Sequence, residues 1–164
     1  MPAFAAYAEA LDYPAGGAPP APAAESPVVR ELVEQYAAAA AELTPGRLEE
    51  IYAATFDLQP ECTLNLSHHL FSDDEWKRSA MLIELKALFQ RHALDTAGEL
   101  PDHLCWLLRL MAAAPEGDAE LREVRTRLML PALRQLQERV RELRNPYPPL
   151  LQALYLELSS EADA

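Results

Sequence analysis

The sequence predicts an all-α fold, a single-domain irregular bundle of about seven or eight helices. Apolar residues recur at spacings of three and four, which is the period of a helix with one buried face. The chain contains 14 prolines and only 5 glycines, a balance typical of helices with sharp ends. With 164 residues, half of them apolar, it can bury one core. We therefore expect one helical domain over residues 1–164, with a Pro/Ala/Gly-rich loop at 14–27.

Proline, serine and threonine positions set the expected helix boundaries. Ser26 and Thr44 each precede a proline and are expected to act as N-caps. Ser72 and Glu75 have the spacing of a capping box, and Pro131 should kink or split the longest helix. The expected helices, in chain order, are 3–12, 27–42, 46–57, 62–71, 73–93, 101–113, 118–144 and 148–159.

The net charge of −12 restricts the possible partners. A nucleic-acid binder needs Lys and Arg for phosphate contacts, so nucleic acid is not an expected partner. A partner that carries positive charge fits better. The only cysteines, Cys62 and Cys105, form no disulfide framework and suit a cytoplasmic protein with reduced thiols. No apolar run approaches the length of a membrane span, so we expect no direct membrane insertion.

The stretch "TFDLQPECTLNLSHHLF" at 55–71 is the first candidate for chemistry. Adjacent His68 and His69 would point about 100° apart on a helix, so they are poorly placed to bind one metal ion. Cys62 lies about 10 Å from His69 if both are on one helix, which is also too far. Cys105, between leucine and tryptophan, is most simply a small buried hydrophobe. We therefore predict no catalytic residue, no metal site and no permanently bound cofactor.

Five segments along the chain resemble those of the NarJ family, the nitrate reductase delta subunits or molybdenum-cofactor assembly chaperones, within the TorD/DmsD-like redox-enzyme maturation chaperones. The most specific is "ELPDHL", which begins the fourth segment. Ser72, Ser79 and Cys105 differ from the residues that many members have. The segments are "ALDYP" at 10–14, "IYAATFDLQPECTLNLSHHLF" at 51–71, "KRSAMLIELKALFQRHAL" at 77–94, "ELPDHLCWLLRLMA" at 99–112 and "RNPYPPLLQAL" at 144–154.

This resemblance implies a cytoplasmic, non-enzymatic private chaperone. Its partner would be the catalytic (alpha) subunit of a molybdenum oxidoreductase, bound through that subunit's basic N-terminal leader. The expected client is respiratory nitrate reductase, although related enzymes use similar chaperones. The chaperone would hold the apo-subunit while molybdopterin-guanine-dinucleotide and an iron–sulfur cluster are inserted. The alternative is a helical scaffold that binds another amphipathic helix, and a monomer or weak dimer is expected.

A basic, amphipathic leader would be matched by an acidic helical surface with an apolar groove. Tyr52 and Phe56 share one helix face and could belong either to the core or to such a groove. Asp102 could be a helix-start acid or a contact to the leader, and replacing Asp57 and Asp102 with Asn is expected to weaken leader binding with little loss of fold. Histidines in the groove would make binding sensitive to pH near neutrality. The candidate client-binding residues are Tyr52, Phe56, Asp57, His68, His69, Phe71, Asp102 and His103.

Overall fold

A computed structural model describes residues 2–162, and it confirms the all-α prediction. The expected domain, 1–164, extends slightly beyond this range at both ends. Within the described residues the only β interaction is an isolated bridge between Asn65 and His103. The α-helices are α1 (Pro2–Ala10), α2 (Pro27–Ala41), α3 (Pro45–Tyr52), α4 (Ser67–Phe71), α5 (Glu75–Arg91), α6 (Leu104–Ala113), α7 (Ala119–Val124), α8 (Leu130–Val140) and α9 (Tyr147–Ala162). Two π-helical segments, η1 (Ala53–Asp57) and η3 (Arg125–Met129), and the 3₁₀ turn η2 (Pro60–Cys62) complete the set.

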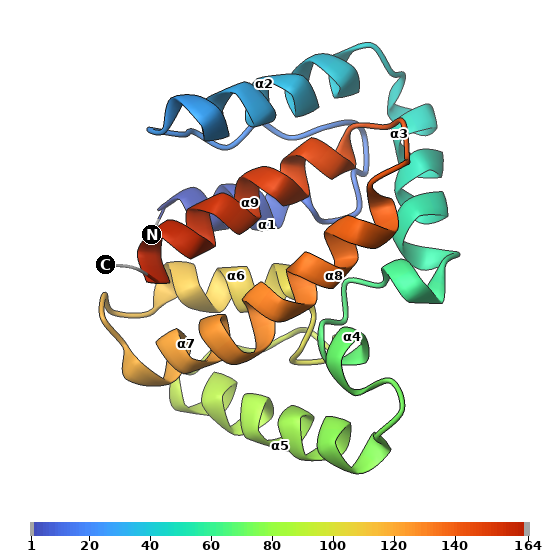
Figure 1. Cartoon of the computed structure of the whole chain (residues 1–164). Coiled ribbons are helices and arrows are strands. Elements are labelled where there is room, and N and C mark those ends of the chain that lie inside the picture. The colour runs from blue at the N-terminus through green and yellow to red at the C-terminus, as the bar shows by residue number, and fades with distance from the viewer. Residues whose placement is uncertain (1, 163–164) are drawn as a thin grey trace.

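The helices pack around a leucine-rich centre (Figure 1). Helix α9 packs between α2 and α8, and α1 packs against α6. Helix α4 packs against both α8 and α5, and α5 lies at the edge of the bundle. Burying each leucine side chain contributes about 1.5–3 kcal/mol before entropy is counted. The fully buried leucines of α6, α8 and α9 include Leu107, Leu108, Leu133, Leu136, Leu150 and Leu154.

The helix caps follow the sequence in part. Thr44 caps α3 as expected, because its hydroxyl accepts a hydrogen bond from the backbone N–H of Arg47 at 3.3 Å. Ser26 occupies the N-cap position of α2, but its side chain makes no capping bond. The capping box expected at Ser72 is wrong. Asp74 caps α5 instead, with its carboxylate accepting from the N–H of Lys77 at 3.0 Å.

Two expected helices are shorter than predicted for one common reason. Residues 62–71 form a helix only from Ser67, and the helix expected at 101–113 begins at Leu104. The residues before Ser67 and those around the start of α6 form backbone hydrogen bonds with each other instead. The N–H of Leu66 donates to the carbonyl of Asp102 at 3.0 Å, and the N–H of Leu104 donates to the carbonyl of Leu64 at 2.9 Å. A tertiary contact has therefore replaced the first turn of each predicted helix.

The long helix predicted at 118–144 is split, as Pro131 suggested. The break takes the form of η3, in which the N–H of Leu130 donates to the carbonyl of Arg125, five residues back. This wider turn lies directly before Pro131, at the start of α8, where a missing N–H costs least. The helix expected at 46–57 similarly changes from α to π after Tyr52. No helix in the described part of the chain is both long and apolar enough to cross a membrane.

Candidate functional site

The two segments with the most specific sequence patterns, "NLSHH" and "LPDHL", are held together inside the protein. The Asp102 side chain is fully buried. Its Oδ2 atom accepts hydrogen bonds from the backbone N–H of Ser67 at 3.0 Å and from the Ser67 hydroxyl at 2.5 Å. The Ser67 oxygen also accepts from Nε of Arg78, on α5, at 3.1 Å. This network fixes the start of α4 to the end of the loop that follows α5.

Asp102 is therefore not the helix-start acid that the sequence suggested. His103 occupies the N-cap position of α6, and its Nδ1 atom accepts from the N–H of Cys105 at 3.3 Å. An accepting Nδ1 carries no proton, so protonating this imidazole there would remove the cap. Burial is the main cause that lowers the pKa of His103 below its ordinary value.

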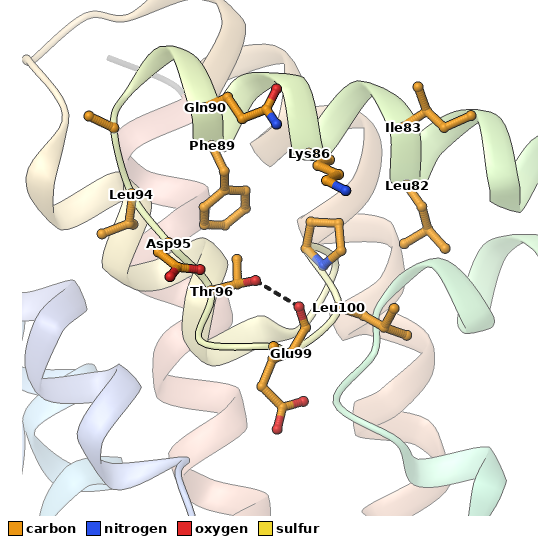
Figure 2. A pocket seen from close by; sticks show the side chains of 13 residues that line it. Leu82, Ile83, Lys86, Phe89, Gln90, Leu94, Asp95, Thr96, Glu99 and Leu100 are labelled. Atoms are coloured by element: carbon orange, nitrogen blue, oxygen red, sulfur yellow. Dashed lines mark hydrogen bonds between the residues drawn. The ribbon is translucent and has the colours of Figure 1, made fainter.

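An apolar pocket of about 690 Å³ lies between α5 and the loop at 93–101, directly before Asp102 (Figure 2). Phe89 points from α5 toward the loop, and Leu82 and Leu100 lie at one end. Its volume is within the range of about 300–1,000 Å³ typical of ligand pockets. The lining residues are Leu82, Ile83, Lys86, Phe89, Gln90, Ala93, Leu94, Asp95, Thr96, Gly98, Glu99, Leu100 and Pro101.

The local sequence turns the chain back under α5 to form this pocket. Helix α5 ends in a Schellman motif: the N–H of Ala93 donates to the carbonyl of Gln90, and the N–H of Leu94 donates to that of Phe89, both at 3.1 Å. Ala93 has a φ of 53°, a left-handed conformation that is costly for alanine. The motif normally brings its first and last side chains together, and here both Phe89 and Leu94 line the pocket.

Charged groups stand at the pocket rim. Asp95 and Glu99 lie on the loop, and Lys86 lies on α5 (Figure 2). Asp95 accepts a hydrogen bond from the N–H of Ala97 at 3.1 Å, which orders the carboxylate. Glu99 is exposed, and its carboxylate points away from α5. Within the described chain none of these three groups forms an ion pair, so all three charges can meet a partner.

Tyr52 and Phe56 lie in the core. Both are 5% exposed or less. Their rings are 5.1 Å apart, and each also packs edge-on against Tyr147, at 5.7 and 5.1 Å. The Tyr52 hydroxyl donates to the carbonyl of Leu11 at 2.9 Å. The spacing that suggested a groove is accounted for by this aromatic cluster, which ties α3 and η1 to α9 and to the segment after α1.

His69 is buried and hydrogen-bonded at both ring nitrogens. Its Nε2 atom lies 2.7 Å from the carbonyl oxygen of Thr63, which can only accept, so Nε2 carries the proton. Its Nδ1 atom then accepts from Nη1 of Arg139 on α8 at 2.7 Å. Burial is the largest cause that lowers the His69 pKa, and Arg139 lowers it further. His68 is half-buried, with its ring 5.9 Å from that of His69.

The remaining candidates are at the surface. Asp57 is exposed at the end of η1, and Phe71 is half-buried at the end of α4. None of the eight predicted residues lines the pocket, although Asp102 and His103 directly follow the loop that forms its wall. Ile83, which was not among the predicted residues, lines the pocket and is on the opposite side of α5 from Leu85. Apolar residues on both sides of this helix were the available signal.

The part of the chain that the structure describes contains no arrangement of side chains suited to metal binding or to catalysis by a thiol. No group of three or more His, Cys, Asp or Glu side chains there is arranged to hold a metal ion. Cys62 and Cys105 are both buried free thiols. Burial raises the pKa of each thiol, which keeps it protonated and a weak nucleophile at neutral pH.

An open apolar pocket with a charged rim, on an all-helical bundle, suits a protein that binds a helical segment of a partner. A model of the nitrate reductase delta subunit family matches residues 23–152, so the chain belongs to that family. This agrees with the resemblance inferred from the five sequence segments. Its members are maturation chaperones, not catalytic enzymes, and they act with a nitrate reductase catalytic subunit. Among curated proteins, no sequence matches the chain significantly.

Proposed function

We propose that the protein binds the N-terminal leader of the catalytic subunit of a nitrate reductase in the pocket between α5 and the 93–101 loop. It holds the apo-subunit there while molybdopterin-guanine-dinucleotide is inserted into that subunit. The cofactor is cargo of the client and is not a resident group of the chaperone. The observation that carries the proposal is the apolar pocket, rimmed by Asp95 and Glu99, that adjoins the "LPDHL" segment.

The chemistry of the pocket fits a basic, amphipathic helix. Phe89, Leu94 and Leu100 offer apolar surface to its anchoring side chains. The unpaired carboxylate of Asp95 favours Lys or Arg on the flank of that helix, and Glu99, whose carboxylate points away from α5, adds negative charge on the outer side of the loop. The net charge of −12 would speed the encounter with a basic leader.

The loop that forms one wall of the pocket is fixed at both ends. The Schellman motif holds it at Leu94, and the Ser67–Asp102 network holds it directly after Pro101. Between them, the Thr96 hydroxyl donates to the carbonyl of Glu99 at 2.8 Å. A wall ordered before the leader arrives reduces the entropy lost on binding.

Calorimetric titration with a synthetic leader peptide from a nitrate reductase catalytic subunit tests this proposal. Leu100 is 42% exposed, so a Leu100→Glu variant should fold while placing a charge in the pocket. Leu58, 73% exposed at the end of η1 and outside the pocket, provides the matched control Leu58→Glu. We expect about micromolar or tighter binding by the wild type and the control, and at least about tenfold weaker binding by Leu100→Glu.

Equal binding by all three proteins would exclude the pocket as the site. Absence of binding by the wild type to any such leader would overturn the proposed function itself. Binding instead to unrelated amphipathic helices would favour the alternative, a helical scaffold protein.

A further inference from the structure

Helix α5 has two apolar faces, and the bundle covers only one of them. Leu85, Leu88 and Phe89 face inward and are at most 3% exposed. On the other side, Trp76 is 87% exposed and Ile83 is 71% exposed. Helix α5 lies at the edge of the bundle, and its outer side faces away from the other helices (Figure 1).

The outer apolar residues follow the spacing of a helix–helix seam. Trp76, Ala80, Ile83 and Ala87 are separated by four, three and four residues, so they lie in one row along α5. The two alanines are small, which lets a second helix approach closely between the larger residues. Seven residues of helix place Trp76 about 10 Å from Ile83, or about two turns.

This row continues directly into the pocket, because Ile83 belongs to both. We infer that the outer face of α5 is the second half of the leader-binding surface, and that it takes a basic amphipathic helix extending from the pocket to Trp76. The inference rests on the proposed function and specifies its ligand. The leader helix must carry apolar side chains about two turns apart, one for the pocket and one for Trp76.

The charges along this surface favour a basic occupant. Arg91 is paired with Glu120 at 2.7 Å, and Lys77 lies 3.9 Å from Asp74, so both of these positive charges are partly compensated. Within residues 2–162, Arg78, whose Nε donates to the Ser67 hydroxyl, and Lys86 are the Lys and Arg residues of α5 that form no ion pair. The acidic residues between 73 and 99 are Asp73, Asp74, Glu75, Glu84, Asp95 and Glu99.

The acids also lie at both ends of the row. Asp73, Asp74 and Glu75 adjoin Trp76, while Asp95 and Glu99 stand at the pocket. A second copy of this acidic chain, placed along the same row, would bring like charges together at those positions. The basic leader is therefore the occupant that the charges support.

Replacing Trp76 tests the inference separately from the pocket. Trp76→Ala removes the second anchor, and its exposure means that the fold should tolerate the change. Val28, 60% exposed on α2, gives the control Val28→Ala. By calorimetric titration with the same leader peptide, we expect Trp76→Ala to bind about tenfold more weakly than the wild type and Val28→Ala to bind equally.

Tryptophan fluorescence supplies a second readout. Burial of Trp76 under the leader should shift the emission of the wild type to shorter wavelength, and a Trp76→Phe variant, which retains Trp106, should lack this shift. If the wild type binds the leader but Trp76→Ala binds it equally well and no shift occurs, this inference is overturned, while the pocket is still tested by Leu100→Glu. If the wild type does not bind the leader at all, both proposals fail.

Discussion

The Ser67 hydroxyl donates to the buried Asp102 carboxylate at 2.5 Å, joining two segments that lie 35 residues apart in the chain. The second carboxylate oxygen of Asp102, Oδ1, has no hydrogen-bond partner. A buried carboxylate is costly unless hydrogen bonds compensate for its lost hydration. Both hydrogen bonds to Oδ2 of Asp102 come from Ser67, and the Ser67 hydroxyl oxygen in turn accepts a hydrogen bond from Arg78.

Ser67→Ala should destabilise the protein. The substitution removes one hydrogen bond to a charged acceptor, which corresponds to a loss of about 1–3 kcal/mol in the free energy of unfolding. Asp102→Asn should also destabilise, because an amide replaces the acceptor of two bonds. Urea denaturation measures both changes, and Asp57→Asn, at an exposed position, should leave the midpoint unchanged. Wild-type stability in both variants would show that this network does not hold the loop.

This prediction replaces the expectation, based on sequence, that Asp102→Asn would act on binding with little loss of fold. Because Asp102 is fully buried, we expect the first effect of this substitution to be a loss of stability.

Tyr52→Phe should lower stability without affecting the leader. The variant loses the hydrogen bond from the buried hydroxyl to the carbonyl of Leu11, a cost of about 0.5–1.5 kcal/mol. The ring stays in the aromatic cluster, and Tyr52 does not line the pocket. Thermal unfolding and leader titration on the same sample provide the two readouts. Reduced leader affinity at unchanged stability would instead place Tyr52 in the binding surface.

Stability should fall as the pH drops below about 6.5, because the pKa of His69 is lowered in the folded state. Between that lowered pKa and the ordinary value of 6.5, the unfolded chain binds a proton that the folded chain does not. The slope is at most about 1.4 kcal/mol per pH unit for each such histidine, and His103 adds to it in the same direction.

The histidine responsible can be identified by substitution. The groups around His69 are Arg139, His68 and Asp102, and the His69 ring can gain a proton only at Nδ1, which now faces Arg139. His69→Gln should therefore reduce the pH dependence between pH 7 and 5.5 to the part due to His103, whereas His68→Gln should preserve it. Urea midpoints across this range give the comparison. An unchanged slope in His69→Gln would contradict the assignment.

Neutralising the pocket rim should weaken leader binding in a salt-dependent way. In a variant that combines Asp95→Asn with Glu99→Gln, we expect about three- to tenfold lower affinity at low salt. The difference from the wild type should shrink as salt screens exposed charges. Glu34→Gln, at an exposed position on α2, is the control. Parallel salt dependences in all three proteins would argue that the rim does not meet the leader's charges.

Helix content and most boundaries could be predicted from the sequence because they depend on local signals. Thr44 with its following proline marked the start of α3, and Pro131 marked the break before α8. The start of α6 could not be predicted, because Pro101 and Asp102 resemble a helix start, but Asp102 and Leu104 hydrogen-bond to residues 64–67. That contact is non-local, and no pattern within either segment reveals it.

The candidate site was harder to predict than the fold. The chosen aromatic and acidic residues lay in the most specific segments, and Tyr52, Phe56 and Asp102 among them are buried. A specific sequence pattern can arise from close packing in the protein core as well as from a binding surface. By contrast, helical geometry alone could have identified Trp76 and Ile83 from the sequence. They lie opposite the buried face of α5, and an exposed apolar pair there requires an explanation.

We propose that the leader occupies the pocket under α5. Amide and methyl chemical-shift mapping by NMR, with isotope-labelled protein and unlabelled leader peptide, tests it most directly. We expect the largest changes at Ile83, Leu94, Glu99 and Leu100, and little change at the core residues Phe56 and Leu136. Changes confined to another surface, such as the outer side of α2, would contradict it.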